Sequence, residues 1–426
     1  MEEVVVLVLV VCTALVFDFT NGFHDTGNAM ATSIATGALR PKVAVALSAV
    51  LNLAGAFLSV EVARTVGTDV VDLSLAHGEQ LMLIVFAGLI GGILWNLLTW
   101  MWGLPSSSSH ALFGGLIGAT FVWGIVHGVN AVLWGSIILK VILPALVSPI
   151  LAGCVSALVV ATVTALTRRI PDKRAQRGFR HGQIATASLL SIAHGTNDAQ
   201  KTMGVIFLAL FAYGAVDQDT PLPLWVKIAC ALAIALGTYI GGWRVIRTLG
   251  KGLVELAPSQ GLSAEVSSAV VIFTSSHFGL PLSTTHVATG SILGSGVGVR
   301  GATVRWSVAG RMVVAWVTTL PAAAVVGGMC WWLGSLIGGI GGAFLLVALL
   351  VVSATGIWWR ARRAPVTPEN VNAEWVRPGD VPASGSAEPA VPAEPAVPAE
   401  PAVPVEPGET DQTAVTRQTH RAGTIR

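Results

Sequence analysis

The sequence predicts an all-α polytopic membrane protein made of two inverted-topology repeats, with broken helices, re-entrant hairpins and one extra C-terminal helix. The composition is the first reason: 53% of the 426 residues are hydrophobic and 11% are charged, against about 25% charged in soluble domains. Apolar runs long enough to cross a bilayer, about 20 residues each, recur from Val4 to Trp359. They are too continuous for the alternating strands of a barrel, so the spans are helices.

Run lengths and glycine, proline and polar interruptions predict where the helices begin and end. In the first half they are expected at about 3–36 (broken near Asn21), 42–63, 80–101, 107–126 and 131–167. In the second half they are expected at about 183–213 (broken near Gly195), 223–246, 260–278, 283–298 and 304–330. The chain therefore divides into a first repeat (1–167), a basic loop (168–182), a second repeat (183–335), an extra helix (336–359) and a tail (360–426).

Internal repetition is a further reason for the predicted fold class, because it indicates two related halves. Four segments recur in the same order in the two halves: GLPSSSSHALFGGLIG (103–118) with GLPLSTTHVATGSILG (279–294), NGFHD (21–25) with HGTND (194–198), ARTVG (63–67) with IRTLG (246–250), and more weakly LPALVSP (143–149) with LPAAAVV (320–326). Four ordered matches indicate a duplication. If each repeat crosses the membrane an odd number of times, the second is inverted relative to the first, which is the usual plan of secondary transporters.

Charge predicts the orientation. Residues 168–181 hold six Lys or Arg side chains and one acid, which places this segment in the cytoplasm and the acidic N-terminus outside. The extra helix then returns the chain to the cytoplasm, with Trp358, Trp359 and Arg360 at the interface.

The tail contains a Pro-rich low-complexity stretch and is expected to be disordered. A net charge of +2 does not suggest a nucleic-acid partner, and four scattered cysteines indicate no cofactor or metal site.

Two polar clusters interrupt the apolar runs at equivalent positions, and ionisable residues in such runs are functional candidates because burying them is costly. The first cluster comprises Asn21, Gly22, His24, Asp25, Thr26 and Asn28, and the second comprises His194, Gly195, Thr196, Asn197, Asp198, Gln200 and Lys201. A glycine in each predicts an unwound helix whose free N–H groups suit an anion, while Asp25 and Asp198 suit a coupling cation or proton. Polar groups can also merely join helices, but two buried carboxylates would be an expensive way to do so.

The duplicated GLP segments predict two re-entrant hairpins. Hydroxyls follow each proline and can cap the next helix, leaving amides for anion oxygens; a plain capped turn is the alternative. The candidate residues here are Ser107, Ser108, Thr284 and Thr285, with His110 and His286 as further possibilities. Elsewhere in the spans, Glu265 is a candidate for ion coupling and Asn52 a possible site residue, while Lys201 could pair with Asp198 or with the anion.

At these motifs the chain resembles the inorganic phosphate transporter (PiT) family, and in particular low-affinity bacterial phosphate permeases. NGFHDTGNAMAT and HGTNDAQKTMG look like the family's duplicated signature, and the GLP segments look like its paired hairpins. The resemblance implies phosphate binding at Asp25, Asn28, Asn197, Asp198, Ser107, Ser108, Thr284 and Thr285, a location in the bacterial cytoplasmic membrane, and a homodimer. The amide at Asn52 resembles the residue found in proton-coupled members of the family, whereas Glu265 resembles the pattern of sodium-coupled members. Protons are favoured as the coupling ion, and sodium is the alternative.

The resulting hypothesis is a secondary active symporter that takes up inorganic phosphate by alternating access, with no catalytic residues. A sulfate permease of the same family is the nearest alternative, and a metal–phosphate complex could be the cargo. A membrane-embedded hydrolase could use the same Ser, His and Asp residues, but paired candidates favour a symmetric binding site over one nucleophile with one base. Buried acids also suit coupled transport better than a passive channel.

Overall fold

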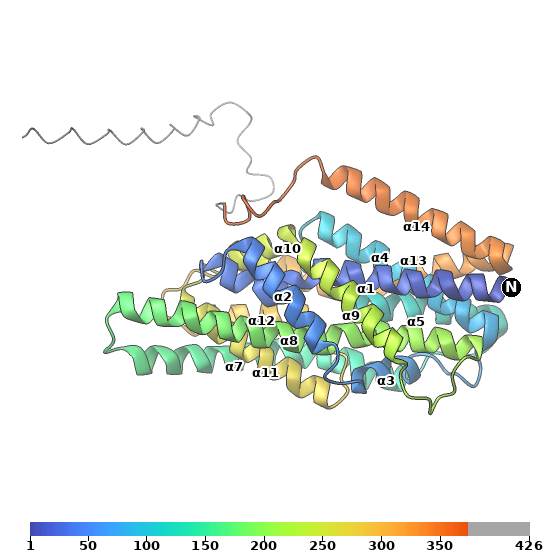
Figure 1. Cartoon of the computed structure of the whole chain (residues 1–426), viewed down its shortest axis with the longest axis horizontal. Coiled ribbons are helices and arrows are strands. Elements are labelled where there is room, and N and C mark those ends of the chain that lie inside the picture. The colour runs from blue at the N-terminus through green and yellow to red at the C-terminus, as the bar shows by residue number, and fades with distance from the viewer. Residues whose placement is uncertain (374–426) are drawn as a thin grey trace, which may run out of the picture. The chain divides into compact units, whose positions relative to one another are not determined.

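The computed structural model describes residues 1–373, and within this range every regular element is a helix apart from two isolated β-bridges. The first half contains α1 (Glu2–Ala35), α2 (Pro41–Gly55), α3 (Glu61–Thr68), α4 (Gly78–Met101), α5 (Ser108–His127), α6 (Trp134–Ile137), the π-helix η1 (Ile138–Ile142) and α7 (Leu143–Thr167). The second half contains α8 (Asp172–Tyr213), α9 (Leu224–Ile240), α10 (Trp243–Arg247), the π-helix η2 (Thr248–Gly252), α11 (Pro258–His277), α12 (Thr284–Val297), α13 (Trp306–Ile337) and α14 (Gly339–Ala361). Most helices follow one common direction (Figure 1).

Six helices in the described range are long and apolar enough to cross a membrane, or seven if α9 and the helical segment Trp243–Gly252 form one bent span. This confirms the prediction of a multi-pass, all-helical membrane protein. The bend between these two segments is 60°, so a broken helix is present. It lies where Gly241, with a φ of 77°, follows the last residue of α9.

The structure corrects the two predicted helix breaks. α1 runs unbroken through Asn21 and α8 through Gly195. The glycines instead allow a neighbouring backbone to approach: a Cβ on Gly22 would lie 2.4 Å from the Ile234 carbonyl oxygen of α9, and one on Gly195 would lie 2.2 Å from the Asn52 oxygen of α2. Small residues serve this purpose at many membrane helix contacts.

The partner helices α9 and α2 also place glycines at these two contacts. A Cβ on Gly237 of α9 would lie 2.1 Å from the Phe19 oxygen of α1, and one on Gly55 of α2 would lie 2.2 Å from the Ile192 oxygen of α8. Phe19 and Ile192 are as far apart in the chain as Asn21 and His194. The crossing of α1 with α9 therefore uses the same positions as the crossing of α8 with α2, and the repetition seen in the sequence extends to the packing.

Each GLP segment forms a buried turn between two helices, α4 with α5 and α11 with α12. Ser106 and Ser107 are at most 1% exposed and Ser283 is 2% exposed, as expected of a hairpin that turns inside the protein. The turns also cap the helices that follow them: Ser107 Oγ accepts a hydrogen bond from the His110 amide at 3.1 Å, and Ser283 Oγ accepts one from the His286 amide at 3.2 Å.

The helices after the turns pack against the opposite half of the chain. A Cβ on Gly114 of α5 would lie 2.4 Å from the Leu320 oxygen of α13, and one on Gly290 of α12 would lie 2.2 Å from the Pro149 oxygen of α7. Pro149 and Leu320 are therefore equivalent in packing. The weak match between LPALVSP and LPAAAVV was accordingly out of register, because it paired Leu143 with Leu320.

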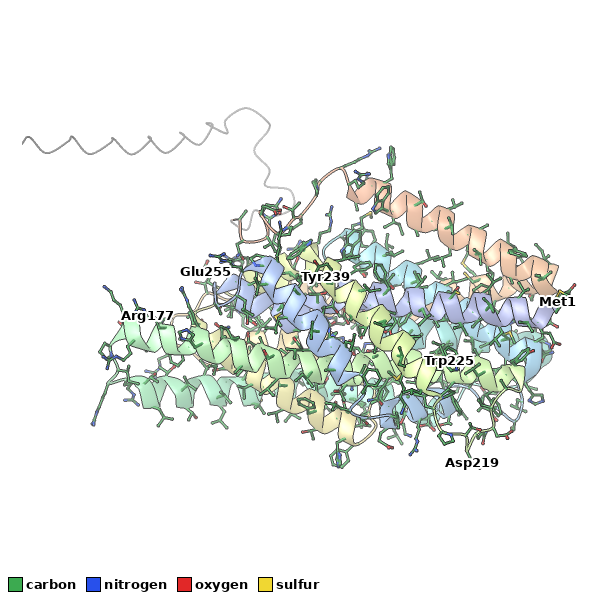
Figure 2. All side chains as sticks on the ribbon, viewed as in Figure 1. Met1, Arg177, Asp219, Trp225, Tyr239 and Glu255 are labelled. Carbon is green, nitrogen blue, oxygen red and sulfur yellow. The ribbon has the colours of Figure 1, made fainter. Side chains whose placement is uncertain are left out.

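The basic segment and the N-terminus lie at opposite ends of the helical body, as the positions of Met1 and Arg177 show (Figure 2). The basic residues from Lys173 onward do not form a loop, since α8 begins at Asp172. Lys, Arg, Ala and Gln are good helix formers, and an acid in the first turn favours a helix start. Only residues 168–171 link α7 to α8.

The described chain continues past the end of the predicted last helix. α14 ends at Ala361, and the guanidinium groups of Arg362 and Arg363 stack on Trp358 and Trp359 at 4.6 and 4.2 Å from the ring centroids. Residues 365–373 then contact the helical body, where Val371 is buried, Asn372 Nδ2 donates to the Ile34 oxygen at 3.2 Å, and Lys42 pairs with Glu369 at 3.0 Å. The Pro-rich stretch of the tail lies outside the described residues.

Candidate functional site

Asp198, on α8, lies at the centre of a fully buried polar network. Its carboxylate forms an ion pair with Lys201 Nζ, accepts a hydrogen bond from Thr284 Oγ1 at 3.1 Å, and lies 3.0 Å from His194 Nε2. Lys201 and His194 follow and precede Asp198 by three and four residues, so one face of the helix presents all three side chains. The pairing of Lys201 with Asp198, one of the two predicted possibilities, is present.

The Lys201 ammonium has a partner for each of its three donors. Besides Asp198 it donates to Ser109 Oγ at 2.6 Å and to the Leu282 oxygen at 2.9 Å. A buried charge is tolerated only when it is paired and hydrogen-bonded in this way. Lys201 therefore joins α8 to the turn regions of both hairpins.

Asp25, the equivalent acid on α1, is 2% exposed and its Oδ1 lies 2.6 Å from His24 Nδ1. The other ring nitrogen of His24 lies 3.3 Å from Thr99 Oγ1 and 3.4 Å from Ser106 Oγ. The two hydroxyls are 2.7 Å apart. This chain of contacts connects Asp25 with α4 and with the turn of the first hairpin.

Asn28 connects α1 with the second hairpin, since its Nδ2 donates to Thr284 Oγ1 at 3.2 Å and to Thr285 Oγ1 at 3.0 Å. In the repeat, Asn28 corresponds to Lys201 and Thr285 to Ser109. The bonds Asn28 to Thr285 and Lys201 to Ser109 therefore occupy equivalent positions, and each runs from a long helix of one half to the hairpin of the other half.

The two clusters predicted from the sequence meet in one place. Asp25, His194 and Asp198 each offer a ligand atom, and these three atoms lie within 4.8 Å of one another. Two carboxylates and an imidazole can hold a small cation, although the sequence had led us to predict no metal site.

Several buried polar atoms around this group have no hydrogen-bond partner in the protein. They include Ser108 Oγ, Asn28 Oδ1 and Asn197 Oδ1. Asn197 is held by its amide, which donates to Ser276 Oγ at 2.9 Å and to the Leu280 oxygen at 3.3 Å. Buried groups of this kind normally have partners, so their lack of one needs an explanation, and a bound polar solute would supply it.

Glu265 is placed apart from Asp25 and Asp198. Its Oε1 accepts hydrogen bonds from Thr32 at 2.7 Å, Ser33 at 2.5 Å and Gln183 at 3.2 Å, and its Oε2 accepts one from Thr186 at 2.5 Å. Thr32 is seven residues beyond Asp25 on α1, a distance of about 10 Å along the helix. Glu265 and its partners therefore form a second polar cluster, between α1, α8 and α11.

The remaining predicted residues are also buried in the helical body. Asn52 Oδ1 lies 3.3 Å from His194 Nδ1, and Asn52 Nδ2 donates to Thr238 Oγ1 at 2.9 Å. The His110 and His286 rings, at the starts of α5 and α12, contact each other with centroids 4.8 Å apart. Asn21 is buried on α1, one residue before Gly22.

Gly22 and Gly195 cannot have the role predicted for them. Free amides at a helix break were expected to bind the anion, but both glycines lie inside unbroken helices, where amides bond to carbonyl oxygens of the preceding turn. The amides at the starts of α5 and α12 remain possible anion donors, because the first turn of a helix leaves such groups without helical partners.

One buried acid was not predicted from the sequence. Asp18, on α1, is 0% exposed, and neither of its carboxyl oxygens has a hydrogen-bond partner. The signal was available, since an acid within an apolar span is a functional candidate by default. Its position outside the duplicated motifs hid it.

The fold and the buried polar network define a class of protein: a multi-pass helical membrane protein that encloses charged and polar side chains between its helices. A family model described as "Phosphate transporter family" (PHO4) matches residues 21–327, and the chain belongs to this family. The resemblance seen in the sequence is confirmed.

Similar proteins agree with this assignment. The chain is 61% identical over 374 residues to a Mycobacterium tuberculosis protein named "Probable low-affinity inorganic phosphate transporter", covering 88% of each chain. It is 41% identical over 334 residues to a Bacillus subtilis protein of the same name, covering 78% of this chain and 98% of that one. A solved structure titled "The sodium-dependent phosphate transporter" has the same fold, with a TM-score of 0.69, 22% identity, and coverage of 78% of this chain and 100% of that one. The chain thus belongs to a phosphate transporter family whose similar members are named as transporters and not as enzymes, which argues against the hydrolase alternative.

Proposed function

We propose that the chain is a secondary active symporter that takes up inorganic phosphate into a bacterial cell, at a site formed by α1, α8 and the two hairpin turns. One observation carries the proposal: four elements from both halves bring Asp25, His194 and Asp198 together beside buried polar atoms that lack partners. Such a site can hold an oxyanion on hydroxyl and amide donors while a cation offsets its charge.

The buried carboxylates favour phosphate over sulfate. A phosphate at neutral pH carries at least one O–H group and can donate it to a carboxylate, whereas sulfate has no proton to donate. A buried acceptor without its donor is costly, and polar sites reject analogues that lack the matching group for this reason. Asp25 and Asp198 would therefore select a protonated oxyanion.

The structure offers support for either coupling ion. We favour protons, because the polar clusters contain acids and histidines that can carry them. Sodium is the alternative, and the Glu265 cluster would suit it, since sodium prefers oxygen ligands and five side chains supply oxygens there. A metal–phosphate cargo would instead use Asp25, His194 and Asp198 for the metal.

We further propose that the second repeat is inverted in the membrane, that the basic start of α8 faces the cytoplasm together with the C-terminal tail, and that transport proceeds by alternating access. Met1 and Arg177 lie at opposite ends of the body (Figure 2), as this topology requires. A homodimer in the cytoplasmic membrane is proposed from the family resemblance.

Uptake of radiolabelled phosphate into proteoliposomes tests the proposal. We expect accumulation under an imposed pH gradient without sodium, and at least a tenfold loss in Ser108→Ala, because the hydroxyl would bind a phosphate oxygen. Ser335→Ala, at an exposed position on α13, is the matched control and should behave as the wild type. Uptake driven only by a sodium gradient would replace protons by sodium as the coupling ion. Absence of phosphate uptake under either gradient would contradict the proposal, and transport of labelled sulfate in its place would favour the sulfate alternative.

A further inference from the structure

Asp18 differs from the other buried acids of the described chain. Among residues 1–373, four carboxyl side chains are buried: Asp18, Asp25, Asp198 and Glu265. Asp25 contacts His24, Asp198 is paired with Lys201, and Glu265 accepts four hydrogen bonds. Asp18 has no hydrogen-bond partner at either oxygen and forms no ion pair in this part of the chain.

Asp18 is closed off from solvent, and the polar groups around it come from α8 and α9. Thr202 of α8 lies close to it, but the Thr202 hydroxyl is itself buried and without a hydrogen bond. Asp198 and Lys201 on α8 act on Asp18 through their charges, and Cys230 lies near it on α9. A buried carboxylate without a hydrogen bond or an ion pair is costly, because its charge has no partner in contact.

Asp18 is nevertheless close to the proposed site. It precedes Asp25 by seven residues on α1, which is two helical turns and about 10 Å, and so lies on the same face of the helix. Thr202 follows Asp198 by four residues on α8, one turn away on the same face. A change in the pairing of Asp198 with Lys201 would therefore alter the field at Asp18.

Asp18 has no equivalent acid in the second half of the chain, whereas Asp25 is equivalent to Asp198. Asn21 and His194 are 173 positions apart, and the same offset takes Asp18 to Ser191. Ser191 donates to the Ala187 oxygen at 2.9 Å and lies 3.0 Å from Ser48 Oγ, so it only joins α8 to its surroundings. The acids at the centre of the site occur in both halves, whereas this acid occurs once.

We propose that Asp18 is the proton-binding group that couples phosphate transport to the pH gradient. The inference rests on the proposed symport function and names the residue that binds the coupling proton. One acid without a permanent cation partner can take up a proton from one side of the membrane and release it to the other as the site changes its access. Asp25 and Asp198, already engaged with basic groups, would hold the substrate.

The test compares two transport modes in the same proteoliposomes: exchange of internal for external phosphate with no pH gradient, which needs no net proton movement, and accumulation driven by a pH gradient without sodium. We expect Asp18→Asn to keep exchange within about twofold of the wild type and to lose accumulation at least tenfold. Asp18→Glu, which can still carry a proton, should keep both. Asp217→Asn makes the same chemical change in an exposed loop and should keep both.

Asp18→Ser installs the residue found at the equivalent position of the other half, and it serves as the second neutral variant if Asp18→Asn does not fold. Accumulation by both neutral variants at the wild-type level would overturn the proposal. Loss of exchange together with accumulation in a folded neutral variant would also overturn it, because Asp18 would then belong to the phosphate site or its framework. A wild type that shows neither mode would instead contradict the proposed function itself.

Discussion

The buried ammonium of Lys201 shows how single side chains define the site. All three of its donors are used, by Asp198, Ser109 and the Leu282 carbonyl, so its position fixes α8 against both hairpins. The pair of Lys201 with Asp198 was one of two possibilities that the sequence offered, because a spacing of three residues on a helix brings two side chains to one face. It could not predict the contact with Ser109, since that depends on how the hairpin packs.

Removal of this cation should destabilise the protein. In Lys201→Met the Asp198 carboxylate keeps Thr284 and His194 but loses its permanent counter-charge, and breaking a buried pair from one side costs about 3–5 kcal/mol. We expect a lower midpoint of thermal unfolding in detergent, partly restored in the double variant Lys201→Met with Asp198→Asn. Lys173→Met, at an exposed position of α8, should unfold like the wild type. Equal midpoints for Lys201→Met and this control would show that the pair is not a structural requirement.

Among the helices, the main error of prediction concerned glycine. A glycine in an apolar run either weakens a helix or lets a second backbone come close, and the sequence does not distinguish the two because the partner helix is unknown. Gly22 and Gly195 proved to be contact positions, as the nearby carbonyls of Ile234 and Asn52 show. The order of the long helices and the approximate ends of most of them were predictable from run length and from glycine, proline and polar interruptions, but the start of α8 at Asp172 was not.

The close packing of α1 against α9 can be tested by a substitution that adds a single carbon atom. Gly22→Ala would place a Cβ 2.4 Å from the Ile234 oxygen, so the two helices must separate, and overpacking of this kind costs about 1–3 kcal/mol. We expect a lower unfolding midpoint and reduced phosphate uptake, because α1 carries Asp25 and Asn28. Gly356→Ala in α14 has no atom within 4 Å of the added Cβ and should be neutral or slightly stabilising. Similar unfolding of both variants would contradict the close packing.

For the whole molecule, the decisive feature is that helices and side chains of each half contact the other half. α5 of the first half packs on α13 and α12 of the second packs on α7, while Asn28 and Lys201 each reach the opposite hairpin. Figure 1 shows the long helices α1 and α8 within the same bundle as these pairs. Short motifs indicated the duplication, but only the packing shows that neither half could form the site alone.

The proposed orientation predicts which loops a membrane-impermeant thiol reagent can reach. In a variant with the four native cysteines replaced by alanine, Asp217→Cys should react from outside intact cells, because it lies in the loop after α8. Arg169→Cys, between α7 and α8, should react only after the membrane is opened. Labelling of both from outside, or of neither, would contradict a single passage of α8 across the membrane.

Phosphate binding to the purified protein tests the central claim most directly, because it needs neither a coupling ion nor a known orientation. Equilibrium binding of labelled phosphate should be saturable, and unlabelled phosphate should displace the label far better than sulfate does. The affinity should fall about tenfold or more, equivalent to about 1.4 kcal/mol, in Asn28→Ala and in Ser108→Ala. It should not change in the control Ser335→Ala. Binding that is unchanged in Asn28→Ala and Ser108→Ala would place the phosphate site elsewhere in the protein and contradict the site described between α1, α8 and the two hairpins.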